Sequence, residues 1–134
     1  MSKRRTSHHV LHEIKNVKQE RGAGRRRWFE SDGFDLVVWL DRADRITGFQ
    51  ICYDLGHGEH ALTWRAGTGF AHSTIDTGDD SPFVNRTPVL EPDGNVPWSE
   101  IAHVFDDRSQ SLDPVLRQLV HDRLAEQAGA SAER

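Results

Sequence analysis

The segment His57–His60 places two imidazoles and the carboxylate of Glu59 within four residues. Zinc takes imidazole and carboxylate ligands in proteins, and a loop could direct both histidines at one ion. No third or fourth ligand follows at a characteristic spacing, and the glycines Gly56 and Gly58 are typical of a hairpin turn. We therefore expect a turn here, and we predict neither a metal site nor a cofactor.

His72 and Cys52 are the candidates for acid–base and nucleophilic chemistry. An imidazole with its ordinary pKa of about 6.5 could act as a general base, and a thiol beside a histidine could act as a nucleophile. No catalytic motif surrounds either residue, so the catalytic residues stay unassigned. One enzymatic alternative remains, in which Arg26 or Arg65 holds an anionic metabolite and His72 serves as acid or base.

A basic, aromatic stretch runs from Arg25 to Phe29, and single-stranded nucleic acids are bound by such combinations of charge and stacking surface. Residues 1–30 hold nine Lys or Arg and three Glu, a net charge of +6. The other 104 residues hold eight Arg and eighteen Asp or Glu, a net charge of −10. Because this acidic body would repel phosphate, nucleic-acid binding through the N-terminal arm is a disfavoured alternative.

The candidate residues lie in a run of strand-like segments between Arg26 and Asp76. Clusters of β-branched and aromatic residues alternate there with turn signals, at 28–29, 36–40, 49–53, 61–64 and 70–75. Asp32–Gly33 is typical of a two-residue hairpin loop. The pattern predicts an antiparallel β-meander of five to six strands, with Pro88 suited to a short edge strand.

Such a meander has two unlike faces, because side chains alternate along a strand and each loop fixes the register. With even-numbered loops, one face is apolar and forms the core: Phe29, Leu36, Val38, Leu40, Phe49, Ile51, Leu62 and Trp64. The other face is mixed: Arg26, Trp28, Val37, Trp39, Gln50, Cys52, Thr63 and Arg65. If the Gly67–Thr68 turn is also even, the mixed face gains Phe70, His72, Thr74 and Asp76.

The C-terminal part indicates two helices. Pro97 and Ser99 precede the first, and Asp113 before Pro114 is a favourable start for the second. The second helix carries an apolar stripe from Leu116 to Leu124 that should pack on a sheet face. We predict an α+β fold, a meander with two C-terminal helices packed on one face.

The chain divides into three expected parts. Residues 1–24 form a basic arm, 25–128 a single α+β domain, and 129–134 a frayed tail. Within the arm, the pattern of residues 8–19 fits a short helix or a strand. No apolar run approaches the roughly 20 residues of a membrane span. The single cysteine, Cys52, favours a reducing compartment, and we expect a cytoplasmic protein.

Several segments resemble those of a group of small uncharacterised bacterial proteins. They are Arg26–Phe29, Asp35–Trp39, Phe49–Asp54, Ala61–Trp64 and Thr87–Leu90. The likeness covers about residues 11–127. It implies a compact bacterial cytosolic protein, and it assigns no activity, cofactor or catalytic residue.

The preferred hypothesis is a small non-enzymatic binding or interaction module that uses the mixed face. A water-facing sheet surface rarely carries two tryptophans without a ligand, a partner or a covering segment. The candidate ligand-binding residues are Arg26, Trp28, Trp39, Arg65 and His72. The candidate partners are a second copy in a homodimer and an anionic small molecule, and no membrane contact is expected.

Overall fold

The computed structural model describes residues 9–15, 17, 19, 24–56, 58–74, 87–88 and 96–132. Its strands are β1 (His12–Glu13), β2 (Arg25–Glu30), β3 (Phe34–Leu40), β4 (Ile46–Asp54), β5 (Glu59–Arg65), β6 (Gly69–Thr74) and β7 (Thr87–Pro88). The helices are α1 (Trp98–Arg108) and α2 (Pro114–Ala132).

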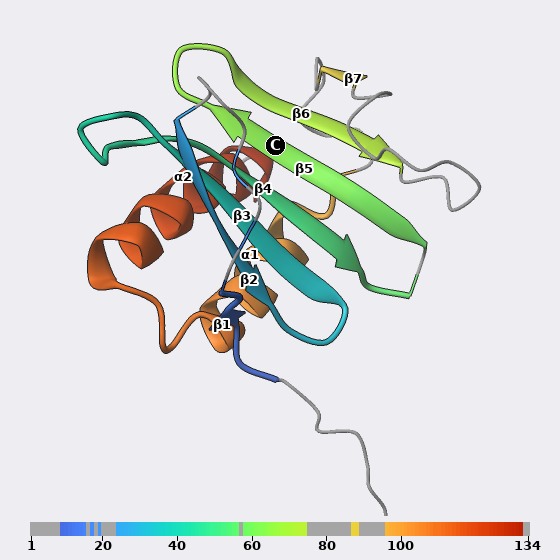
Figure 1. Cartoon of the computed structure of the whole chain (residues 1–134). Helices are drawn as coiled ribbons and strands as arrows, with labels where there is room; N and C mark the ends of the chain where they lie inside the picture. The colour runs from blue at the N-terminus through green and yellow to red at the C-terminus, as the bar shows by residue number, and fades with distance from the viewer. Residues whose placement is uncertain are drawn as a thin grey trace, which may run out of the picture.

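The strands form one antiparallel sheet in sequence order from β1 to β7 (Figure 1). Five long strands make up the meander, and the two-residue strands β1 and β7 extend its edges. Both helices follow the sheet in the chain, so the predicted α+β meander is confirmed. Among the described residues, no helix combines the length and apolar character needed to cross a bilayer.

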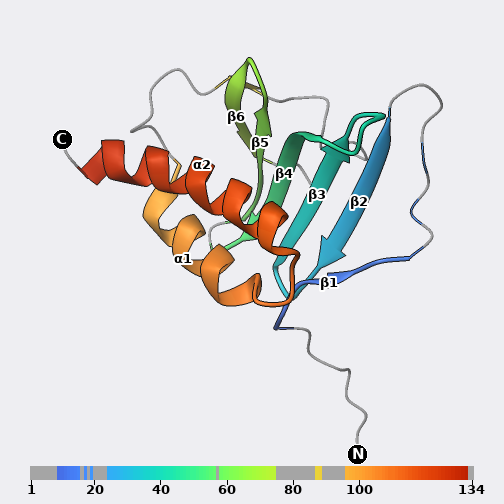
Figure 2. The same ribbon diagram turned by 90° about the vertical axis from the view of Figure 1, so that its left-hand side faces the viewer.

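Both helices lie on the same side of the sheet (Figure 2). The sheet side of this core holds the expected apolar residues, which are buried apart from the partly exposed Trp64. From α2, Leu116, Val120 and Leu124 are buried against it, which confirms the predicted stripe. Each such side chain contributes about 1.5–3 kcal/mol when it leaves water.

The β2–β3 hairpin has the predicted register, and the β3–β4 hairpin keeps the predicted faces although its loop is odd. Asp32 and Gly33 form the loop between β2 and β3, so that Phe29 lies opposite Leu36 and Trp28 opposite Val37. Between β3 and β4 the register shifts by one residue beside Trp39. This bulge offsets the odd loop of residues 41–45, so Val38 and Phe49 still share the core face.

The β5–β6 hairpin differs from the even-loop expectation. Arg65 lies opposite Gly69, so three residues connect the strands, and the Thr68 N–H donates to the Arg65 carbonyl at 3.1 Å. An odd loop reverses every downstream side chain. Phe70, His72 and Thr74 therefore lie on the helix-covered face, and their expected place on the mixed face is wrong. Asp76 falls outside the described residues.

The N-terminal segment lies along the free edge of β2. Beyond β1, the Ile14 N–H donates to the Trp28 carbonyl at 2.8 Å. The side-chain amide of Gln19 then imitates a strand, because it accepts from the Arg26 N–H at 2.9 Å and donates to the Arg26 carbonyl at 3.0 Å. Of the two alternatives for residues 8–19, the described ones show a strand and no helix.

Candidate binding site on the outer face of the sheet

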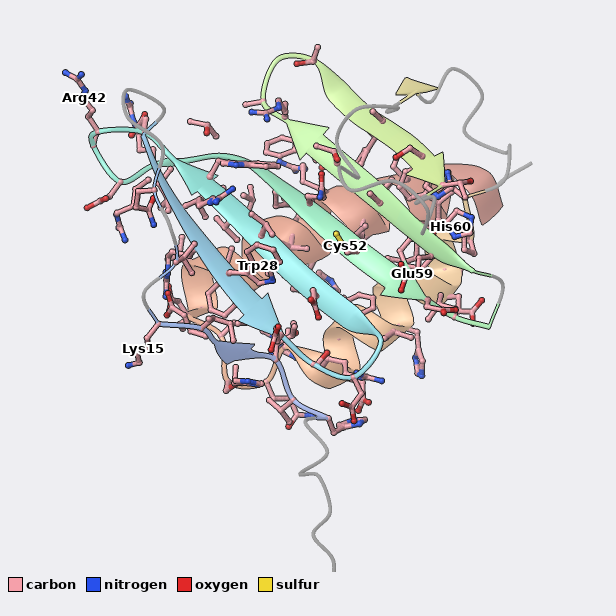
Figure 3. All side chains as sticks on the ribbon, turned by 45° about the vertical axis from the view of Figure 1, so that its right-hand side comes forward. Lys15, Trp28, Arg42, Cys52, Glu59 and His60 are labelled. Atoms are coloured by element: carbon pink, nitrogen blue, oxygen red, sulfur yellow. The ribbon has the colours of Figure 1, made fainter. Side chains whose placement is uncertain are left out.

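The outer face is the side of the sheet turned away from α1 and α2. Alternation along the strands places on it Arg26, Trp28, Asp35, Val37, Trp39, Gly48, Gln50, Cys52, Glu59, Ala61, Thr63 and Arg65. Figure 3 shows Trp28, Cys52 and Glu59 on the side of the sheet toward the viewer, with the helices behind. The mixed face predicted for β2 to β5 is therefore present and is not covered by the helices.

A hollow of about 420 Å³ lies on this face. Its lining includes Trp28 from β2, Asp35 and Val37 from β3, Gln50 and Cys52 from β4, and Glu59 from β5. Such a volume is within the range of roughly 300–1,000 Å³ that is usual for small-molecule sites. Four adjacent strands of a hydrogen-bonded sheet thus hold the lining in place.

The centre of the outer face is a fixed polar network. Gln50 is fully buried, and its amide oxygen accepts a hydrogen bond from the Thr63 hydroxyl at 2.8 Å. Its amide nitrogen donates to the Cys52 sulfur at 3.3 Å. Both ends of the Gln50 side chain are therefore engaged, which fixes the orientation of this amide beside the hollow.

The acidic groups of the hollow shape its electrostatics. Burial raises the pKa of Asp35, against the opposing effects of the Ser31 N–H and the Trp28 indole. Burial also raises the pKa of the Cys52 thiol to about 11, and the charges of Asp35 and Glu59 add to this shift. The thiol is therefore protonated at neutral pH and is a poor nucleophile there.

The indole nitrogen of Trp28 is buried and makes no hydrogen bond of standard geometry to any residue that the structure describes. It lies close enough to Asp35 to lower the pKa of that carboxyl. The indole N–H and the Asp35 carboxyl are therefore neighbouring polar groups in the lining of the hollow.

The other end of the outer face is basic and aromatic. The Arg65 guanidinium lies over the Trp39 ring, 4.4 Å from its centre. Gly48 separates these residues in the strand register, and Arg26 lies opposite Trp39 on the other side. The structure thus brings together Arg26, Trp39 and Arg65, with Trp28 two residues along β2 from Arg26.

His72 does not join the other four candidates. Its Nε2 lies 2.8 Å from the Tyr53 hydroxyl on the helix-covered face, and its ring stacks on that of His60 with centres 5.2 Å apart. Burial, followed by the nearby His60, lowers the pKa of His72. The sheet therefore separates His72 from Arg26 and Arg65.

Sequence reasoning missed Asp35 and Glu59 as lining residues, and it did not bring His60 and Tyr53 to His72. Asp35 carried a usable signal, because it is a single charge within the apolar run of β3 and has the same parity as Val37. The place of Glu59 on the outer face depends on the four-residue loop that connects Asp54 to Glu59. His72 lies on the same face as His60 and Tyr53 because the β5–β6 loop has three residues.

No three His, Cys, Asp or Glu side chains gather to hold a metal ion within the described part of the chain. His57, the first histidine of the segment considered for metal binding, lies outside that part. A second depression, of about 360 Å³, lies beside α1 and α2. Its polar groups bind one another, as in the 2.9 Å contact between Asp106 and His121.

No protein-family model matches the chain, and neither a curated protein nor a solved structure is significantly similar to it.

Proposed function

We propose that this protein is a small non-enzymatic binding module of the cytoplasm and that the outer face of its sheet is the binding surface. One observation carries the proposal: the hollow of about 420 Å³ is formed by four adjacent strands on the face that the helices leave uncovered. Trp28 and Trp39, both partly exposed, lie on that same face. Tryptophans with one accessible side are common at binding sites.

The arrangement of polar groups supports binding over catalysis. Cys52 is protonated at neutral pH, since its pKa is raised to about 11. His72 and the two arginines of the enzymatic alternative lie on opposite faces of the sheet, so no single site can use all three. A hollow in a hydrogen-bonded sheet, with a fixed amide and an indole N–H beside Asp35, is suited to holding a ligand in one orientation.

Nucleic-acid binding receives less support from the basic stretch. Arg25 pairs with Asp44 at 2.9 Å, and Arg27 pairs with both Glu13 and Asp113. These contacts neutralise two of the three consecutive arginines within the protein itself. Fewer charges are then available to displace counterions from a phosphate backbone.

A fragment screen followed by two-dimensional NMR tests the proposal. We expect fragments to shift the indole N–H signal of Trp28 and the side-chain amide signals of Gln50. Cys52→Phe fills the hollow and should abolish these shifts, whereas Val115→Phe, at a position 76% exposed on α2, should leave them intact. Fragments that bind both variants equally, or that shift only signals of the helix-covered face, would contradict the proposal.

A second copy of the chain is the alternative occupant of the outer face. Sedimentation velocity across a concentration range distinguishes it from a small ligand. If Trp39→Ser dissociates a dimer that the unmodified protein forms, the outer face is a homodimer interface, and its ligand is a second copy of the chain.

A further inference from the structure

We propose that the hollow on the outer face selects an organic cation, an amine on an apolar or aromatic body, over an anion of the same shape. This inference rests on the proposed function and names the ligand class of that site. It reverses the charge expected from the arginines in the sequence, because those arginines lie at the other end of the face.

The described lining of the hollow is acidic. Three carboxylates line the hollow, from Asp35, Asp54 and Glu59, and no Lys or Arg of the described residues lines it. Among the effects on the pKa of Asp35, the charge of His12 is the weakest. A concave acidic surface with low-dielectric walls concentrates cations.

The state of Asp35 also favours a cation. This carboxyl is partly buried on the outer face, where it accepts a long hydrogen bond of 3.4 Å from the Ser31 N–H and interacts with the Trp28 indole. A half-buried carboxylate bears a desolvation cost, which is why its pKa is raised. An ammonium group placed beside it would supply both charge and N–H donors.

The lining of the hollow also offers aromatic and apolar surface. Trp28 presents an aromatic surface next to Asp35, and Val37, which lies opposite Trp28 in the strand register, adds an apolar side chain to the lining. Cations are attracted to the face of an indole, and most strongly where water is excluded. An aromatic or aliphatic amine therefore matches the hollow in both charge and surface.

The opposite end of the face fixes the direction of the ligand. Arg65 already occupies the face of Trp39 at 4.4 Å, so that tryptophan is taken by a cation of the protein. A second cation there would meet like charge from Arg65 and Arg26. The acidic end at Trp28 is therefore the cation site, and any anionic group of the ligand would point toward the arginines.

Three probes with one aromatic body test the charge preference: phenethylamine, 3-phenylpropionate and 2-phenylethanol. Titrations at about pH 8, where an ordinary carboxyl is ionised, follow the Trp28 indole signal by NMR, assigned through Trp28→Phe. We expect phenethylamine to bind at least about tenfold more tightly than 3-phenylpropionate. Asp35→Asn and Glu59→Gln should each weaken phenethylamine, by about tenfold and threefold.

Controls separate the inference from the proposed function. Asp122→Asn on α2 removes a carboxylate far from the hollow and should change affinity less than about twofold. If 3-phenylpropionate or 2-phenylethanol shifts the Trp28 signal as strongly as the amine, the hollow binds ligands without charge selection, and only this inference fails. If none of the three probes shifts that signal, the hollow does not bind such amines and this inference fails, whereas the proposed function fails only if the fragment screen also finds no ligand. Glu59 is exposed, so Glu59→Gln keeps the test valid should Asp35→Asn not fold.

Discussion

Gly48 sets the geometry of the outer face although it has no side chain. A Cβ atom there would lie 2.7 Å from the Trp64 carbonyl oxygen and 3.3 Å from Cε3 of Trp39. The Trp39 ring thus occupies the space above the glycine, and Arg65 stacks on that ring. Covering a strand glycine with an aromatic ring from the neighbouring strand is a known way to stabilise such a position.

Gly48→Ala should therefore destabilise the protein by about 1–3 kcal/mol, because the new methyl group must displace the backbone of β5 or the Trp39 ring. Urea unfolding followed by tryptophan fluorescence measures the loss. Gly129→Ala in α2 is the matched control, since nothing lies within 4 Å of its Cβ position, and it should stabilise by up to about 1 kcal/mol. Equal stability of Gly48→Ala and the unmodified protein would contradict the close packing at Gly48.

At the scale of elements, counting loop residues predicted the faces of four strands and failed at the fifth. The loops up to β5 preserve parity, through the two-residue Asp32–Gly33 turn, the bulge beside Trp39 and the four residues between Asp54 and Glu59. The next loop holds three residues, and Gly69, the first residue of β6 after it, has a φ of 93°. Glycine in this conformation is typical of three-residue hairpin loops, but Gly67–Thr68 fits a two-residue loop equally well in the sequence.

The helices were predictable for a different reason. An apolar stripe with a 3.6-residue period defines its own buried face, so no loop needs to be counted. The hollow could be predicted only in part, because it needs the register of four strands together with the orientation of the Trp28 ring. The alternation of side chains along the strands predicted that Trp28, Gln50 and Cys52 share a face. It could not predict that this face contains a hollow.

Because the β5–β6 loop is odd, His72 lies on the helix-covered face, and its titration there makes stability depend on pH. In the folded protein its pKa lies below the usual 6.5, so the unfolded chain takes up a proton first as the pH falls. The contribution of His72 to the free energy of unfolding is fully present above the unfolded-state pKa of about 6.5. It declines as the pH drops from about 6.5 toward the lower pKa of the folded state. His72→Gln removes this titration and keeps an acceptor for the Tyr53 hydroxyl.

We expect His72→Gln to flatten the decline in unfolding free energy between about pH 7 and pH 5, and to change stability at pH 7.5 by less than about 1 kcal/mol. Chemical denaturation at a series of pH values measures both quantities. His103→Gln, at an exposed position of α1, is the control and should follow the unmodified protein. A profile for His72→Gln as steep as that of the control would contradict the role of His72.

For the molecule as a whole, Arg27 joins three parts that are far apart in the chain. It donates to both carboxylate oxygens of Glu13 in β1, at 2.9 and 2.8 Å, and to Asp113 before α2 at 3.2 Å. Its own strand, β2, is thereby fixed to the N-terminal segment on one side and to the helical layer on the other. Because these attachments use the edge of β2 and the helix-covered side, they leave the outer face available.

Arg27→Met should cost about 1–2 kcal/mol, since it keeps most of the apolar stem but leaves two carboxylates without their shared cation. Hydrogen exchange should show the loss locally, with the Ile14 amide, which donates to the Trp28 carbonyl, exchanging faster than the amides of β4. Arg45→Met is the control, because Arg45 is 79% exposed and, among the described residues, pairs with Asp41 four residues away, and it should cost under about 0.5 kcal/mol. Equal losses in the two variants would mean that the Arg27 contacts do not hold the N-terminal segment to the sheet. Unchanged exchange of Ile14 would mean that β1 is held by its backbone pairing and by Leu11 in the core.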